Sequence, residues 1–250
     1  MAPERDHKYK EHDSRIKKRK VPKRSVRSPQ NTRAPQATRA SQPRNVHLYN
    51  DGPIEIKRHN SLVISDWDDT LFPTSWISDN DIDLTDLKAR YRYTRYFDAL
   101  DRQLYSMIKK VRKHSDLMIV TNAAKQWVYV TLTVLPKTAQ ILQDVPIVSA
   151  RDGFQHMTDI QNWKRLTFKA ELEKKTHYKN IVSLGDAHYE HLALVDLYNW
   201  NVIPHKYLKS VKFIRSTDCI DLLNQIMLIG GEIPKIVGAQ RHLDLTLEIL

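Results

Sequence analysis

The chain has 250 residues, a formal net charge of +11 and a single cysteine, Cys219. One cysteine excludes an internal disulfide and a cysteine-rich zinc site, and this usage fits a reducing, intracellular compartment. No run approaches the roughly 20 apolar residues of a membrane span, and the first residues lack the apolar stretch of a signal peptide. We therefore expect neither a membrane anchor nor secretion.

The positive charge is concentrated near the N-terminus. Residues 1–60 contain 16 Lys+Arg and 6 Asp+Glu, whereas residues 61–250 contain 24 and 23. Residues 14–50 hold eleven basic residues, four prolines and no acid. Such a segment buries too little apolar surface to offset the entropy cost of ordering it, so we predict a disordered basic tail over residues 1–58.

A short basic run over residues 17–24 resembles the import signals that nuclear transport receptors bind. Three interpretations of residues 14–44 stay open. In the first, the segment binds a nuclear import receptor, which would give a nuclear location. In the second, it binds nucleic acid or another anionic surface. In the third, it is merely solvated and has no specific partner. The remainder of the chain is close to neutral and shows no obvious basic face for nucleic acid.

After residue 60, short apolar runs alternate with longer segments of helical spacing, which is the pattern of an α/β fold. Connections of this kind give parallel strands through right-handed crossovers. We predict strands over 62–65, 117–121, 146–149, 181–184 and 211–214, and helices near 95–113, 125–143, 161–174, 188–200 and 219–229. The domain is expected to span residues 59–230, and residues 231–250 form an extension of unknown role.

Carboxylates and a hydroxyl follow three of these predicted strands. The apolar run 62–65 leads directly into Asp66 and Asp68, residues 118–120 lead into Thr121, and residues 182–185 lead into Asp186. Ligands of parallel sheets gather at the carboxyl ends of the strands. Two carboxylates at a spacing of two can act separately, one beside a cation and one beside a leaving group.

This order of motifs resembles the haloacid dehalogenase-like phosphohydrolase superfamily. Asp66, Asp68 and Thr70 fill the family's first motif, an apolar strand followed by Asp-x-Asp-x-Thr, and Thr121 fills the second. The resemblance covers about residues 60–215. It implies a Rossmann-like three-layer α/β sandwich with a mainly parallel sheet.

The third and fourth motifs are shorter. Gly185 and Asp186 with Glu190 match the fourth motif, a strand that ends in Gly-Asp with a further acid downstream. The third motif is only a lysine upstream of it. Lys164 lies 22 residues before Asp186 and Lys169 lies 17 residues before it, so Lys164 is the candidate and Lys169 the reserve.

The resemblance implies a role for each side chain. Asp66 would attack phosphorus and form an aspartyl-phosphate, which divides one difficult displacement into two easier ones. Asp68 would protonate the departing oxygen and then deprotonate the hydrolytic water. Thr121 and Lys164 would contact the phosphoryl oxygens, and the lysine would offset the repulsion between a carboxylate and an anionic substrate.

The resemblance also implies magnesium as the cofactor. Mg²⁺ prefers six hard oxygen ligands and keeps several waters. The expected ligands are Asp66, the backbone carbonyl of Asp68, Asp186, and Glu190 through water. Other prominent side chains nearby are expected to have structural roles, on the surface or in packing: His156, His188, His191, Trp67, Trp76, Trp127 and Trp163.

The motif spacing leaves no room for a large cap domain. Asp66 and Thr121 are 55 residues apart, Thr121 and Lys164 are 43 apart, and both intervals hold predicted elements, so we expect only a short flap within 72–92. An uncapped site must be covered by its substrate, which favours a macromolecular phosphoester. Capless phosphatases of phosphoserine in proteins match this spacing, although their first motif has Leu where this chain has Trp67.

The resulting hypothesis is a magnesium-dependent phosphomonoesterase that acts through an aspartyl-phosphate intermediate on a macromolecular phosphoester, such as a phosphoprotein. Two alternatives stay open. One is a phosphatase of nucleic-acid ends. The other is a non-catalytic scaffold protein on the same fold, with the basic tail as its nucleic-acid-binding part.

Overall fold

The structure is a computed structural model that describes residues 54–199, 206–215 and 218–247. Residues 1–53 of the predicted basic tail (1–58) lie outside the described residues, and they include the basic run at 17–24. Among the described residues, no helix combines the length and apolar character needed to cross a membrane.

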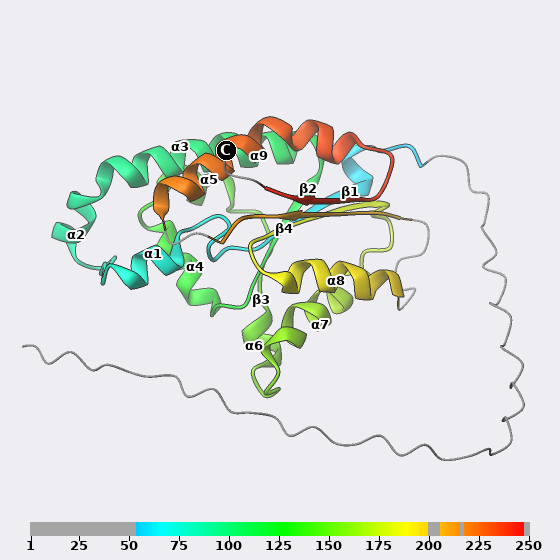
Figure 1. The fold of residues 1–250 in the computed structure, drawn as a ribbon, viewed down its shortest axis with the longest axis horizontal. Helices are drawn as coiled ribbons and strands as arrows, with labels where there is room; N and C mark the ends of the chain where they lie inside the picture. Colours follow the sequence, from blue (N-terminus) through cyan, green and yellow to red (C-terminus); the bar gives the residue numbers. More distant parts are fainter. Residues whose placement is uncertain (1–53, 200–205, 216–217, 248–250) are drawn as a thin grey trace, which may run out of the picture. The chain divides into compact units, whose positions relative to one another are not determined.

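The described part of the chain forms a six-stranded sheet in which all paired strands are parallel, in the order β3-β2-β1-β4-β5-β6 (Figure 1). The strands span Ser61–Ser65 (β1), Asp116–Thr121 (β2), Ile147–Ser149 (β3), Asn180–Gly185 (β4), Tyr207–Lys212 (β5) and Leu243–Thr246 (β6). The helices span Arg58–Asn60 (η1, a 3-10 turn), Thr74–Asp79 (α1), Leu87–Arg92 (α2), Thr94–His114 (α3), Lys125–Leu132 (α4), Pro136–Ile141 (α5), Ala150–Phe154 (α6), Ile160–Glu173 (α7), His188–Asn199 (α8) and Cys219–Gly238 (α9).

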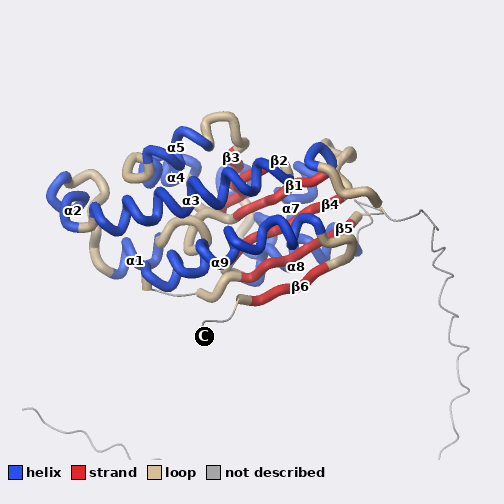
Figure 2. The backbone as a smooth tube through the Cα atoms, turned by 90° about the horizontal axis from the view of Figure 1, so that it is seen from above, coloured by secondary structure: helices blue, strands red, loops and turns tan. Residues whose placement is uncertain are grey.

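Helices cover both faces of this sheet. Helices α3 and α9 lie on one face, and α7 and α8 lie on the other (Figures 1 and 2). Because successive strand residues point to opposite faces, Val63 packs into the core under α3 and α9, whereas Leu62 and Ile64 pack into the core against α7 and α8. The predicted Rossmann-like three-layer α/β sandwich is confirmed, and the described residues between the strands form no large cap domain.

The order in which successive strands are added to the sheet reverses at β1. The chain moves outward from β1 to β2 and β3, and then returns to β4 on the other side of β1. The carboxyl ends of β1 and β4 are therefore neighbours at a topological switch point, where open α/β sheets bind their ligands. Register places Ser65 beside Leu184, so the residues that follow both strands emerge together.

Three details differ from the sequence prediction. The predicted helix over 125–143 is divided into α4 and α5, because Pro136 begins a new helix and cannot continue the previous one. The fifth strand spans Tyr207–Lys212 and not 211–214, because its buried Lys209 and Ser210 hid it among polar residues. Helix α9 continues across the expected boundary at residue 230, and β6 then joins the sheet.

Lys209 lies in β5 and is fully buried, with its Nζ donating to the Val237 carbonyl in the last turn of α9 at 2.7 Å. The side-chain amide of Asn180 donates to the same carbonyl at 2.9 Å. Burial lowers the pKa of Lys209 to about 8. The native state therefore binds the lysine proton less tightly than the unfolded chain, where lysine titrates near roughly 10.4.

We predict that Lys209→Met raises the free energy of unfolding at pH 7 by about 1–3 kcal/mol, because the penalty for burying the charged amine is removed while Asn180 still satisfies the Val237 carbonyl. In the wild type this penalty is complete below pH 8, and it disappears as pH rises toward about 10, since the unfolded state then binds more protons. Denaturant titrations at pH 7 to 10 would measure both effects.

Lys209→Met should remove part of the rise in the free energy of unfolding with pH. The rest of the rise should remain, because burial and the charge of Lys179 also lower the pKa of Lys206 to about 8. Lys212→Met, in the same strand but only half-buried, is the matched control and should keep the whole rise. Equal pH profiles for wild type and Lys209→Met would contradict this account.

Candidate active site

Asp66 directly follows the central strand β1. Its backbone N–H donates to the Leu184 carbonyl of β4 at 2.8 Å, so the chain still runs along β4 at this position. Its side chain is 6% exposed, and Oδ1 accepts a hydrogen bond from the backbone N–H of Trp67 at 2.7 Å. The Trp67 ring is fully buried and donates from Nε1 to the Thr131 hydroxyl of α4 at 3.0 Å. Trp67 therefore anchors the loop that carries Asp66. The buried indole fits this position, where the first motif of the capless phosphatases has Leu.

Lys164 brings a positive charge to Asp66 from α7. Its Nζ lies 2.6 Å from Oδ2 of Asp66 and also donates to Oε1 of Glu190, and the residue is 1% exposed. Burial raises the pKa of Asp66 well above its ordinary value, and the attraction of Lys164 offsets only part of this effect. Burial alone would lower the pKa of Lys164, but the Asp66 and Glu190 carboxylates outweigh burial and raise it.

The helical position of Lys164 explains why it points inward. Helix α7 begins after Asp159, whose carboxylate accepts a hydrogen bond from the Gln161 N–H at 3.0 Å. Lys164, Phe168 and Leu172 then repeat at a spacing of four on the buried side of the helix. Lys169 is 42% exposed at its side chain and pairs with Glu173 at 3.9 Å. Of the two candidate lysines, the structure thus brings Lys164 to Asp66.

The side chain of Glu190 passes beside Gly185 to reach Lys164. Glu190 lies in the first turn of α8 and is 3% exposed. A Cβ at Gly185 would lie 2.3 Å from Glu190 Cγ and 2.6 Å from its Oε2, so only glycine leaves room for this side chain. Oε1 accepts from Lys164, whereas Oε2 is buried and has no hydrogen-bond partner among the described residues. A buried carboxylate oxygen without a partner indicates that a ligand or water belongs beside it.

Asp68 is held by three donors. Oδ1 accepts from the Thr74 hydroxyl at 2.6 Å and from Trp127 Nε1 at 3.0 Å, and Oδ2 accepts from the Thr121 hydroxyl at 2.7 Å. The loop turns sharply at Asp69, which has a φ of 52° and accepts hydrogen bonds from the backbone and hydroxyl of Ser75. The second carboxylate is therefore fixed in orientation by groups from β2, α1 and α4.

Sequence reasoning missed Thr74, and it assigned Trp127 to packing alone. Trp127 does pack against Phe72, but its Nε1 also holds Asp68. No motif could have revealed this, because Trp127 is 59 positions from Asp68 and the two meet only through the placement of α4. The histidines lie elsewhere: His188 is exposed, and His191 lies 3.5 Å from an Asp244 oxygen.

Asp186 completes the acidic group at the end of β4. It is 9% exposed, and burial together with the negative charge of Glu190 raises its pKa to about 6, although Lys164 acts in the opposite direction. Asp66 and Glu190 thus pair with the ammonium group of one lysine, and Asp186 lies close enough for its charge to act on both Glu190 and that lysine. Such an excess of buried negative charge is unfavourable unless a cation compensates it.

These residues fit a hydrated magnesium ion. Within the described residues, no three His, Cys, Asp or Glu side chains form a metal cage by themselves. Magnesium does not require such a cage, because it keeps several waters and is commonly held by one or two carboxylates. The Asp66 and Asp186 carboxylates and the Asp68 carbonyl are a suitable oxygen set, and the unpartnered Oε2 of Glu190 suits a water-mediated contact.

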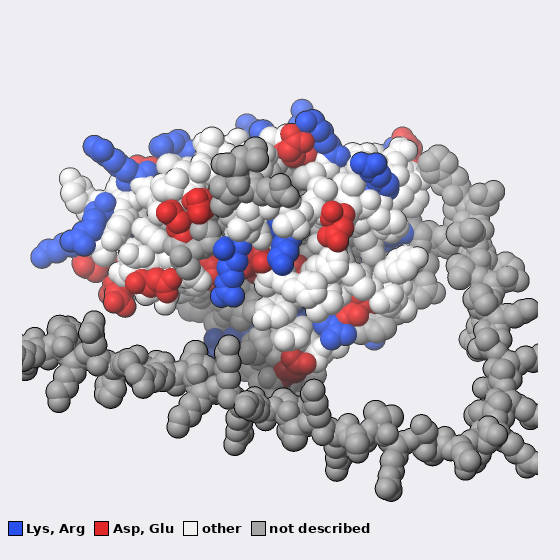
Figure 3. Space-filling view, in the orientation of Figure 1, with Lys and Arg blue, Asp and Glu red and all other residues white. Residues whose placement is uncertain are grey.

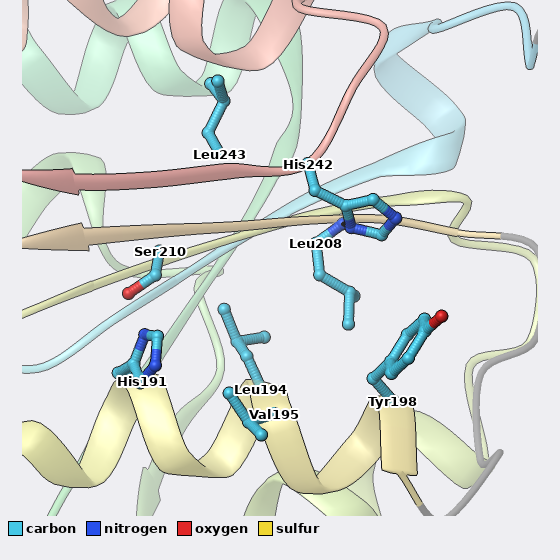
Figure 4. A pocket seen from close by; sticks show the side chains of 8 residues that line it. All are labelled: His191, Leu194, Val195, Tyr198, Leu208, Ser210, His242 and Leu243. Carbon is cyan, nitrogen blue, oxygen red and sulfur yellow. Dashed lines mark hydrogen bonds between the residues drawn. The ribbon is translucent and has the colours of Figure 1, made fainter.

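A separate apolar pocket of about 280 Å³ lies between α8 and strands β5 and β6 (Figure 4). Its polar lining consists of His191, His242, Tyr198 and Ser210, and leucine side chains form much of the remainder. The imidazole of His242 is engaged, since its Nδ1 accepts a hydrogen bond from the Leu208 N–H at 3.2 Å. None of the predicted site residues lines this pocket, so the acidic group at the strand ends is the candidate active site.

Comparison of the chain with protein-family models, curated proteins and solved structures finds no match. The resemblance to haloacid dehalogenase-like phosphohydrolases therefore depends on the four short motifs in the sequence.

We predict that Gly185→Ala lowers the free energy of unfolding by about 2–4 kcal/mol, because the added methyl group displaces Glu190 and breaks its buried pair with Lys164. Chemical denaturation would measure the change. Gly231→Ala is the matched control: nothing lies within 4 Å of its added Cβ in α9, so alanine should be neutral or stabilising there. Equal effects of the two substitutions would show that Glu190 is not fixed as described.

Proposed function

We propose that this chain is a magnesium-dependent phosphomonoesterase in which Asp66 is the nucleophile. The main support is one observation: a buried carboxylate at the switch point of a parallel sheet is paired with Lys164 at 2.6 Å, and a second carboxylate follows two residues later. The pairing supports a site for an anionic substrate, because Lys164 offsets the repulsion between Asp66 and a phosphoryl group.

In the proposed reaction, an oxygen of Asp66 attacks phosphorus and forms an aspartyl-phosphate while the bond to the leaving oxygen breaks. Two contacts hold the nucleophile in place, the Trp67 N–H on Oδ1 and Lys164 on Oδ2. A bound Mg²⁺, held by Asp66, Asp186 and the Asp68 carbonyl, would supply positive charge that favours the ionised carboxylates and the transferring phosphoryl group. Water then hydrolyses the intermediate and restores Asp66.

Asp68 serves as general acid and then as general base. It delivers a proton to the leaving oxygen in the first step and removes one from water in the second. The hydroxyls of Thr74 and Thr121 can donate to Asp68 or accept from it, so both protonation states keep their partners. Trp127 Nε1 can only donate, and it fixes the orientation of the carboxylate.

A macromolecular phosphoester is the proposed substrate class, since the chain between Asp66 and α3 forms only the short helices α1 and α2. Within the described part of the chain, these helices leave the site without a domain to close it, and a large substrate can exclude water in its place. We also propose that the protein acts in the nucleus, and that residues 14–44 bind an import receptor or nucleic acid. This segment lies outside the described residues.

We predict that Asp66→Asn lowers kcat/KM for an aryl phosphate by roughly 1,000-fold or more, because an amide cannot act as the nucleophile. The fold should persist, since Lys164 keeps its pair with Glu190. Phosphate release and thermal melting would be measured together. Asp116→Asn, at the opposite end of β2, is the control and should retain wild-type turnover. Full activity of Asp66→Asn would refute the nucleophile assignment.

We also predict that a chelator abolishes phosphate release and that added Mg²⁺ restores it. Ca²⁺ should not restore it, because the larger ion takes more ligands in a looser geometry. Turnover by the wild type would be followed before and after chelation and on titration of each ion. Unchanged turnover in the presence of chelator would remove magnesium from the mechanism.

A further inference from the structure

A hollow of about 520 Å³ lies between the segment around α1 and the helix α4. We call it the Trp127 hollow, and its lining includes Trp127, Thr74, Ile77, Ile82, Asp81 and Asp83. Its volume falls within the roughly 300–1,000 Å³ of ligand clefts. Figure 3 shows acidic side chains along the lower edge of the molecule near α1, with basic side chains beside them at the end that carries α2.

Two residues connect the Trp127 hollow to the candidate active site. Thr74 and Trp127 both line it, and both donate hydrogen bonds to Oδ1 of Asp68. In the proposed mechanism Asp68 delivers a proton to the leaving oxygen. A group that occupies the hollow therefore belongs to the leaving-group side of the substrate, beyond the oxygen that leaves phosphorus.

The lining selects for positive charge. Asp81 and Asp83 are both exposed carboxylates. The carboxylate of Asp81 has no hydrogen-bond or ion-pair partner among the described residues, and hydrogen bonds from Thr85 lower the pKa of Asp83. The indole of Trp127 adds an aromatic surface of the kind that attracts Lys and Arg. A cationic group in this hollow would thus meet both charge and aromatic complementarity.

Of the residues that the structure describes, no basic side chain lines the Trp127 hollow. The basic residues of α2 lie close in sequence but are placed outside it. Arg90, whose charge does reach Asp83, is already bonded to the Leu84 carbonyl and to the Thr133 hydroxyl. The two aspartates of the hollow therefore keep much of their negative potential for a ligand.

We propose that the Trp127 hollow binds the side chain of a Lys or Arg located next to the phosphorylated residue of a protein substrate. This proposal rests on the proposed phosphatase function and narrows its substrate to phosphoproteins with a basic residue near the phosphate. It also disfavours nucleic-acid ends, because each neighbouring phosphodiester would bring a negative charge toward Asp81 and Asp83.

The test compares phosphopeptides that differ only in having Arg or Ala beside the phosphorylated serine, with a 5′-phosphorylated oligonucleotide as a third substrate. We expect kcat/KM to favour the Arg peptide by about tenfold at low salt and by less at high salt, because exposed charge pairs are screened. The double substitution Asp81→Asn and Asp83→Asn should remove most of this preference. Asp98→Asn, an exposed acid on α3 that does not line the hollow, should leave it unchanged.

A binding measurement separates this proposal from the proposed function. Calorimetry with the Asp66→Asn variant would give the affinity for each peptide without turnover, and we expect the same tenfold preference for Arg. Equal affinities and equal kcat/KM for the two peptides, or a preference for the oligonucleotide, would overturn the proposal about the hollow. If the wild type releases no phosphate from the aryl phosphate, the phosphatase function fails, and the affinities still decide whether the hollow selects cations.

Discussion

Lys164 carries its ammonium group from α7 to the carboxyl ends of the central strands, where it lies between the carboxylates of Asp66 and Glu190. All three side chains are nearly inaccessible to water. Removing one member of such a buried pair typically costs about 3–5 kcal/mol, because the remaining charge is left uncompensated. One ammonium group therefore fixes the relative positions of three parts of the structure, namely the start of α8, the loop after β1 and the inward face of α7. The absence of a Cβ at Gly185 is what allows Glu190 to take part.

The sheet topology explains why this charge cluster can also be a site for chemistry. The switch point between β1 and β4 leaves the ends of two neighbouring strands free of a crossover helix, so Asp66 and Asp186 emerge side by side. Burial is the main cause that raises the pKa of Asp186 to about 6 and the pKa of Asp66 in the same direction, and the negative charge of Glu190 adds to both shifts. The three buried carboxylates carry more negative charge than one lysine can neutralise. A bound cation would offset this excess and would also attract an anionic phosphoryl group, and that is the physical basis of the proposed function.

Asp68 couples this charge cluster to the surface beside it. Its three donors come from α1, β2 and α4, and two of them, Thr74 and Trp127, also line the Trp127 hollow. One carboxylate thus connects the Lys164 cluster, where phosphorus would react, with an anionic hollow, where the leaving group would lie. The negative charge of this hollow is the reason to prefer a basic peptide over a nucleic acid as the leaving group.

The sequence by itself determined the α/β class and most of the strands, because buried parallel strands are short apolar runs. It also indicated the six candidate side chains, because Asp66, Thr121 and Asp186 lie at strand ends and the order of the motifs pointed to the others. It also contained a signal that separates the lysines, since Lys164 shares the helical face of Phe168 and Lys169 does not. It could not reveal β5 around the buried Lys209, the strand β6, or the role of Trp127. Only the tertiary structure decided these, because strand pairing, the burial of a charged group and a hydrogen bond between residues 59 positions apart depend on long-range packing that local periodicity does not encode.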